Sequence, residues 1–207
     1  MLIEKTIKTE KRPKIKLSIK ITVVAILFLI LLPTATNPHK IEHRRYIKLY
    51  VGQDKITLFI VFRVPPGEEA FKIRKKNDTN RNDFIDDDEL ERIRDILAFE
   101  SIKGLSVRFQ KRPVNIKVIR KDVELARESY SSLEITGIFE IAIWLAPAPP
   151  PPKFTISITE TLYDHSHLEL ESQFKFKVVK GKLSEDEEGK IVGELKRFEP
   201  ISITFEW

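Results

Sequence analysis

The sequence predicts a mainly β protein, a β-sandwich of the immunoglobulin type with one helical insertion. Two observations carry this prediction. Short segments with β-branched and aromatic residues at alternate positions recur along the chain, and residues rich in Gly, Pro, Asn and Asp separate them. A pattern with helical spacing is confined to residues 68–101. Many short strands with regular turn signals are typical of sandwiches.

The first strands are expected at residues 46–51 and 56–64, with a turn at Gly52 between them. Alternate residues from Ile56 to Val64 are apolar and would share one face. The other face is partly apolar too, because it carries Phe59 and Val61. A strand that is apolar on both faces is usually an interior strand of its sheet.

Strands at residues 105–109 and 114–118 are predicted to pair as a hairpin. A long strand is expected at 135–145, and the proline-rich residues 147–152 should form a stiff, extended connector. Shorter strands are expected at 123–126, 154–158, 168–170, 174–178 and 201–205. We expect residues 37–207 to form a single domain. A split at residues 147–152 into two β domains is the alternative.

Between the strands at 56–64 and 105–109, the sequence predicts two helices, at residues 68–76 and 87–101. Gly104 is a suitable stop for the second helix. This insertion, residues 68–101, is expected to pack on an edge of the sheet. The run D-T-N-R-N-D-F-I-D-D-D-E, residues 78–89, covers the segment between the two helices and the start of the second helix.

This twelve-residue run is similar to the calcium-binding loop of EF-hand proteins. Oxygen-bearing side chains occupy positions 1, 3, 5, 9 and 12, and position 7 would contribute its backbone carbonyl. The expected ligands of Ca²⁺ are Asp78, Asn80, Asn82, Phe84 (through its carbonyl), Asp86 and Glu89. Calcium takes six to eight oxygen ligands at about 2.3–2.6 Å, and this spacing can arrange them around one point.

Position 6 of such loops is usually Gly, whereas this chain has Asp83. Asp is among the non-Gly residues that adopt the left-handed conformation most readily, so we expect modest strain at this position. An alternative interpretation needs no metal. Asp86 and Glu89 have the spacing of a helix capping box, and the run could be a solvated acidic turn.

Residues 1–36 are predicted to be a secretory signal peptide containing an apolar leader helix. A basic stretch ends at Lys20, an apolar run follows at 21–32, and small residues come after Pro33. An uncleaved membrane anchor is the alternative. Both interpretations place the rest of the chain outside the cytoplasm, either periplasmic, secreted or anchored and facing outward. Calcium sites in extracellular modules function with dissociation constants of about 10⁻⁴–10⁻³ M.

Charge and composition narrow the possible functions. The formal net charge of +5 is accounted for by the first 37 residues, which hold seven Lys and Arg and two Glu. The remainder is balanced and has no electrostatic footprint for nucleic acid. Without any Cys, the chain has neither disulfides nor thiolate metal sites.

The order of the elements resembles a known family over residues 44–120. A leader, two strands, Pro65-Pro66, a short helix, the run 78–89, a second helix and the strand pair at 105–114 follow one another. This order resembles the extracytoplasmic N-terminal domain of nickel/cobalt permeases of the hydrogenase- and urease-accessory type. The resemblance implies a sandwich-like domain with one calcium-type hand and a membrane protein partner. It also implies an alternative function, as an accessory domain for Ni²⁺ or Co²⁺ uptake.

Two pairs of histidines could bind Ni²⁺ or Zn²⁺, His39 with His43 and His165 with His167. The alternative is that they are ordinary surface residues. The chain has no G-x-S-x-G, no Gly-rich phosphate loop and no H-E-x-x-H, so we expect a non-enzymatic protein. A third possible function is an adhesion or assembly module that makes contacts through exposed strand edges.

Overall fold

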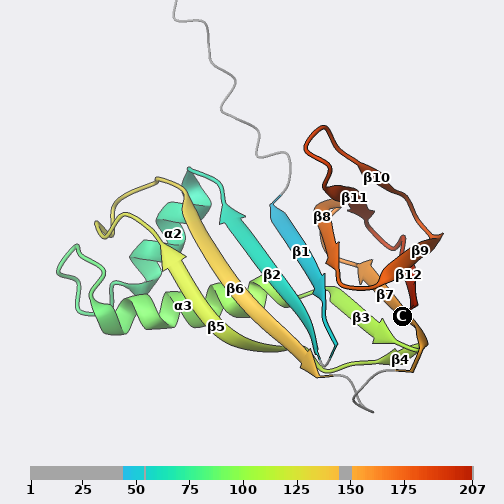
Figure 1. Ribbon diagram of the computed structural model, residues 1–207. Helices are drawn as coiled ribbons and strands as arrows, with labels where there is room; N and C mark the ends of the chain where they lie inside the picture. Colours follow the sequence, from blue (N-terminus) through green and yellow to red (C-terminus); the bar gives the residue numbers. More distant parts are fainter. Residues whose placement is uncertain (1–43, 54, 145–150, 207) are drawn as a thin grey trace, which may run out of the picture. The chain divides into compact units, whose positions relative to one another are not determined.

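The computed structural model describes residues 44–53, 55–144 and 151–206. Within these residues the protein is mainly β, as predicted, with two sheets and two helices (Figure 1). The predicted leader at residues 1–36, His39 and His43 lie outside the described residues. So does most of the proline-rich segment at 147–152.

The larger sheet has seven strands in the order β10-β11-β8-β1-β2-β6-β5. Their bounds are β1 Arg45–Val51, β2 Lys55–Val64, β5 Lys117–Glu124, β6 Ile135–Trp144, β8 His165–Ser172, β10 Leu183–Glu185 and β11 Ile191–Lys196. Neighbouring strands are antiparallel except β1 and β8, which run parallel with Ile47 opposite Leu168. β2 is an interior strand, as its two apolar faces predicted.

The smaller sheet has five antiparallel strands in the order β4-β3-β7-β12-β9. Their bounds are β3 Leu105–Phe109, β4 Arg112–Pro113, β7 Lys153–Glu160, β9 Lys175–Lys180 and β12 Ile201–Glu206. Each of the two sheets combines strands from before residue 145 with strands from after residue 150. The described residues belong to one compact unit.

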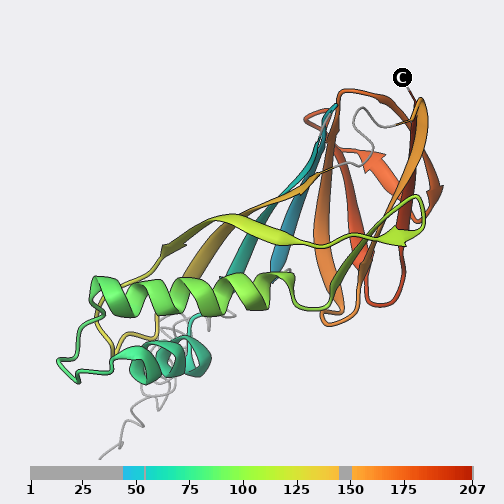
Figure 2. The same ribbon diagram turned by 90° about the horizontal axis from the view of Figure 1, so that it is seen from below.

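The core lies on one face of the larger sheet. Alternate residues of β2, from Ile56 to Val64, are at most 1% exposed. Helices α2 (Glu68–Asn77) and α3 (Asp87–Ile102) connect β2 to β3, and α3 packs on β5, β6 and β2. Figure 2 shows α3 running alongside these strands. Buried residues of the smaller sheet, including Ile156 and Phe205, belong to the same apolar cluster.

The structure differs from the expected arrangement of strands and helices at three places. The hairpin between 105–109 and 114–118 forms only next to its turn. β3 pairs with Arg112 and Pro113, and the N–H of Val114 donates to the carbonyl of Val107 at 3.1 Å, but β5 then pairs with β6 in the other sheet. Helix α3 contacts β5, an edge strand as expected for the insertion, and it also contacts the interior strands β6 and β2. Strands β10 and β11 were not expected, since apart from Leu195 no residue of either strand is buried.

Candidate metal-binding loop

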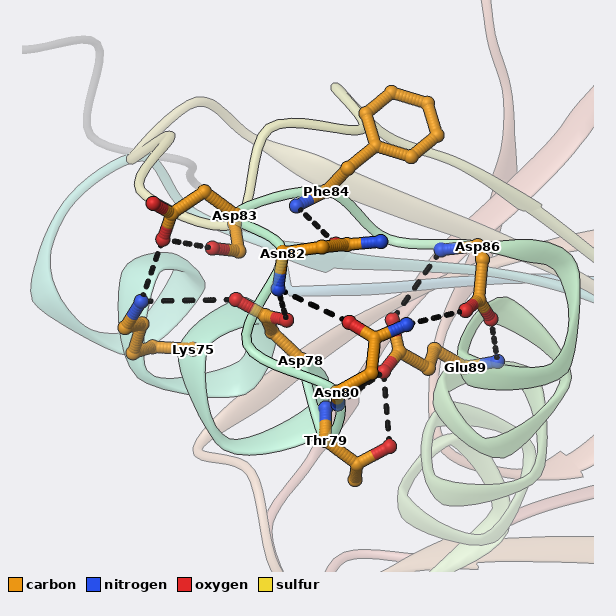
Figure 3. Close-up of polar contacts among 10 residues, drawn as sticks. Lys75, Asp78, Thr79, Asn80, Asn82, Asp83, Phe84, Asp86 and Glu89 are labelled. Atoms are coloured by element: carbon orange, nitrogen blue, oxygen red, sulfur yellow. Dashed lines mark hydrogen bonds and ion pairs between the residues drawn. The ribbon is translucent and has the colours of Figure 1, made fainter.

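The loop of residues 78–86 connects the end of α2 to the start of α3 (Figure 3). α3 begins with a capping box: the Asp86 carboxylate accepts the N–H of Glu89 at 3.0 Å, and the Glu89 carboxylate accepts the N–H of Asp86 at 3.3 Å. The capping role that the spacing allowed is therefore present. It uses the side chains at positions 9 and 12 of the loop.

The chain turns sharply at two residues of the loop. Asp83 has φ 62° and Arg81 has φ 59°, so both are in the left-handed region. The expectation that Asp83 would adopt this conformation in place of Gly is confirmed. Asp tolerates it better than most residues, because its short polar side chain can bond locally. Here the Asp83 carboxylate accepts a hydrogen bond from the Lys75 ammonium at 2.9 Å.

The side-chain oxygens at positions 1, 3 and 5 all face the loop backbone. The N–H of Asn82 is shared between an oxygen of Asp78 at 3.1 Å and the amide oxygen of Asn80 at 3.0 Å. The amide oxygen of Asn82 accepts the N–H of Phe84 at 2.9 Å. In Figure 3 the side chains of Asn80, Asp86 and Glu89 lie close together inside the loop, while the Phe84 ring points away. The loop is thus already curled around its own oxygen atoms.

Glu89 holds the two ends of the loop together. Its side chain is almost completely buried, and one carboxylate oxygen accepts the N–H of Thr79 at 2.6 Å, the Thr79 hydroxyl at 2.9 Å and the N–H of Asn80 at 3.3 Å. Burial acts to raise the pKa of Glu89, but these hydrogen bonds stabilise the charged form more and the net pKa is lowered. Glu89 is therefore an anion at neutral pH.

Asp78 differs from the other loop side chains because it has a buried oxygen without a hydrogen-bond donor. The side chain is fully buried, yet Oδ2 accepts no hydrogen bond within the described residues. The Lys75 ammonium is 3.6 Å away, in ion-pair but not hydrogen-bond contact. Burial acts to raise the pKa of Asp78, whereas the Ser129 hydroxyl, Lys75 and the N–H groups of Asn82 and Asp83 outweigh it and lower the pKa. A buried carboxylate oxygen without a hydrogen bond is uncommon and calls for a partner.

The loop pairs with a distant segment, the connection between β5 and β6. The N–H of Ile85 donates to the carbonyl of Arg127 at 2.7 Å, and the N–H of Ser129 donates to the carbonyl of Asp83 at 3.0 Å. Phe84 and Glu128 form an antiparallel bridge between these two bonds. The Ile85 side chain is fully buried. The loop is therefore one half of a short two-stranded ladder.

A buried arginine organises the other half of this ladder. Arg74, on α2, is fully buried, and its guanidinium contacts backbone carbonyls without a carboxylate partner in the described part of the chain. The carbonyls belong to Ala70, Ala126, Ser131, Leu133 and Glu134. Burial lowers the pKa of Arg74, and the nearby charge of Glu128 opposes this shift.

The role of Arg74 was not predicted from the sequence, although the spacing of Ala70, Arg74 and Asn77 places them on one face of the helix. These three residues are the buried ones of α2. Residues 125–134 carry no periodic pattern, and so nothing in the sequence pointed to them as the partner of the loop.

The loop oxygens do not form a ready-made carboxylate cage. Among the described residues, no three His, Asp or Glu side chains form a group that could hold a metal ion. Two of the three candidate carboxylates are engaged as the helix cap, and Asp86 also accepts a hydrogen bond from the Asn80 amide at 2.9 Å. The residues nevertheless suit a hard cation, because all of the candidate ligand atoms are oxygens and Asp78 Oδ2 accepts no hydrogen bond.

Of the histidines predicted as possible metal ligands, the structure describes His165 and His167, and both have other contacts. His165 lies 3.1 Å from a carboxylate oxygen of Glu194, and the His167 ring packs on Tyr46 with centroids 5.4 Å apart. Both histidines are on β8. Within the described residues, neither α2 nor α3 is long and apolar enough to cross a membrane.

Comparison with known proteins gives no family for the chain. No protein-family model matches it, and no curated protein matches it. Among solved structures, native leukotriene A4 hydrolase from Saccharomyces cerevisiae matches with a TM-score of 0.29 at 10% identity, over 79% of this chain and 28% of that one. A second structure of the native yeast enzyme gives a TM-score of 0.27 at 10% identity, with the same coverage. The chain thus spans under a third of the length of the enzyme chains that it matches.

Proposed function

We propose that this protein is an exported, non-enzymatic calcium-binding module. In this proposal the two sheets form an immunoglobulin-like sandwich, α2 and α3 with their loop are an EF-hand-like insertion, and Ca²⁺ orders the loop and stabilises the β domain. The observation that carries it is Asp78 Oδ2, a buried carboxylate oxygen without a hydrogen bond, at position 1 of a loop with calcium-ligand spacing.

The proposed ligands are compatible with the hydrogen bonds that they already make. The amide oxygens of Asn80 and Asn82 each accept one loop N–H, and a carbonyl-type oxygen has two lone pairs. Asp78 Oδ1 accepts a backbone N–H, whereas Oδ2 accepts no hydrogen bond and has the Lys75 ammonium 3.6 Å away. The remaining proposed ligands are the carbonyl of Phe84 and the carboxylates of Asp86 and Glu89.

The helix cap makes weak binding the expected outcome. To ligate a cation, Glu89 would have to lose some of its hydrogen bonds from Thr79 and Asn80. The hydrogen bond from the Asn80 amide to Asp86 would also have to break. Breaking these hydrogen bonds offsets part of the favourable free energy of calcium binding. We expect a dissociation constant in the range of extracellular modules, about 10⁻⁴–10⁻³ M, which suits a protein outside the cytoplasm.

Calcium would stabilise more than the loop itself. Its proposed ligands come from the end of α2, the loop and the first turn of α3, and the loop is bonded to the β5–β6 connection through Ile85 and Ser129. A bound ion would hold these elements together, and any ligand that binds only the folded state raises stability by mass action.

Calcium titration of the purified full chain tests the proposal. A hundredfold excess over the dissociation constant should stabilise by about 2.7 kcal/mol, or raise Tm by about 5–10 °C for a protein of this size. The double variant D78A/E89Q should lose this response. D88N is the matched control, because Asp88 is an exposed acid of the same run and is not a proposed ligand.

Three outcomes decide the question. Calcium that leaves the Tm of the wild type unchanged would refute the proposal. If calcium raised the Tm of D78A/E89Q as much as that of the wild type, the ion would bind at another site. Mg²⁺ should stabilise less than Ca²⁺ at the same concentration, because it demands a smaller octahedral site and sheds water reluctantly.

A further inference from the structure

We propose that Lys75 is a tethered cation that competes with calcium for the loop and sets the affinity of the site. This inference rests on the proposed calcium function and adds a regulating residue to it. Lys75 lies in the last turn of α2, three residues before the first proposed ligand.

The position of the Lys75 ammonium is the first argument. Nζ lies 2.9 Å from Asp83 Oδ1 and 3.6 Å from Asp78 Oδ2, so it bridges positions 6 and 1 of the loop (Figure 3). Asp78 Oδ2 is the buried oxygen that otherwise has no hydrogen bond. The lysine charge thus sits next to the oxygen that we expect to bind the metal.

The substitution at position 6 is the second argument. Gly at this position would have no side chain, whereas Asp83 supplies the carboxylate that anchors the Lys75 ammonium beside Asp78. The Asp at position 6, where calcium loops usually have Gly, is therefore also the residue that positions the Lys75 ammonium. A lysine ammonium is a compact point charge on a flexible stem, and the Lys75 side chain is 47% exposed. It can swing away when a divalent ion enters.

Two consequences follow from electrostatics. A cation entering the loop must repel or displace the ammonium, so removing that charge should tighten calcium binding. Two unit charges of the same sign about 4 Å apart repel by about 1 kcal/mol at the dielectric constant of bulk water, which corresponds to about a fivefold change in affinity. The effect should also shrink in high salt, because exposed charges are screened.

Lys76 provides a matched control. It is the next residue of α2, it is exposed, and it makes no ion pair within the described part of the chain. K76Q removes the same formal charge from the same helical turn but leaves the Lys75 ammonium beside Asp78. K75R keeps the charge next to Asp78 and should keep the weak affinity.

The experiment is calorimetric titration of CaCl₂ into the full chain and into K75Q, K75R and K76Q, at low and high salt. We expect K75Q to bind about three- to tenfold more tightly than wild type at low salt, and the gain to fall at high salt. K76Q and K75R should stay within about twofold of wild type. Thermal unfolding in EDTA checks that all four proteins are folded.

The outcomes separate this inference from the proposed function. Equal calcium affinity in K75Q and wild type would overturn the role of Lys75 and leave the calcium site in place. Weaker binding by K75Q would overturn it too, and would make Lys75 a support of the loop. No binding by any of the four folded proteins would overturn both the site and the role of Lys75.

Discussion

Arg45 on β1 and Glu160 at the end of β7 form an ion pair in which neither side chain is exposed. The Arg45 guanidinium also donates to the carbonyls of Glu100 and Lys103, where α3 ends. Glu160 accepts the N–H groups of Leu162 and Tyr163. One buried pair therefore joins a strand of each sheet to the end of the helix that begins at the loop.

Breaking this pair should strongly destabilise the protein. We expect R45M to lower the free energy of unfolding by about 3–5 kcal/mol, because it leaves the Glu160 carboxylate buried without its cation. The double variant R45M/E160Q should lose less than the sum of the two single variants. Urea unfolding of all three measures this coupling, and strictly additive losses would show that the two charges do not interact.

Arg74 should control the segment that pairs with the loop. R74M leaves five carbonyls without their charged donor, and we expect a loss of about 3 kcal/mol or more. Amide hydrogen exchange should accelerate at Ile85 and Ser129, whose N–H groups form the ladder. The control is K72M on the same helix, where an exposed ion pair with Glu68 is lost. Unchanged exchange in R74M would contradict this role.

Ile85 should behave as a core residue although it lies in a loop. Its side chain is 0% exposed, so I85A should cost about 2–5 kcal/mol through lost burial and the cavity left behind. I96A on α3 is the matched control, because Ile96 is 40% exposed and its truncation should have a small effect. Similar losses in the two variants, measured by thermal or urea unfolding, would mean that the loop does not pack as described.

The loop carboxylates should make stability depend on pH in the acid range. The folded-state pKa values of Asp78 and Glu89 are below their ordinary values of 3.8 and 4.5, so the unfolded chain binds more protons. Their contribution is fully present above about pH 5 and is lost as pH falls through the ordinary values toward the folded ones. Calcium-free unfolding between about pH 3 and 6 should show this decline. D78N/E89Q should flatten it, and an unchanged slope would contradict the assignment.

Local features of the site could be predicted from sequence, because they depend on residues close together in the chain. The helix bounds at 68–76 and 87–101 differ from those of α2 and α3 by a single residue at each C-terminal end. The capping box of Asp86 and Glu89 and the left-handed conformation of Asp83 follow from neighbouring residues alone.

Features that join distant residues could not be predicted from the sequence. Alternation at 114–118 indicates a strand but does not identify its partner. The expected hairpin therefore extends only to Val114, and β5 pairs with β6 instead. Ile85 forms its backbone hydrogen bond with Arg127, which lies in a segment without periodicity. Strand β1 pairs on one side with β8, which is far away in the sequence. Calcium ligation by the loop stays a prediction, because it depends on how Glu89 divides its bonds between the helix cap and an ion.

The parallel pairing of β1 with β8 has a consequence for folding during synthesis. β1 leaves the ribosome long before β8, which begins at His165, has been made. Until then one side of β1 keeps unpaired backbone N–H and C=O groups, which are a template for aggregation. A nascent chain that stalls before His165 should therefore depend on chaperones, and stop codons placed between residues 145 and 165 should give insoluble products.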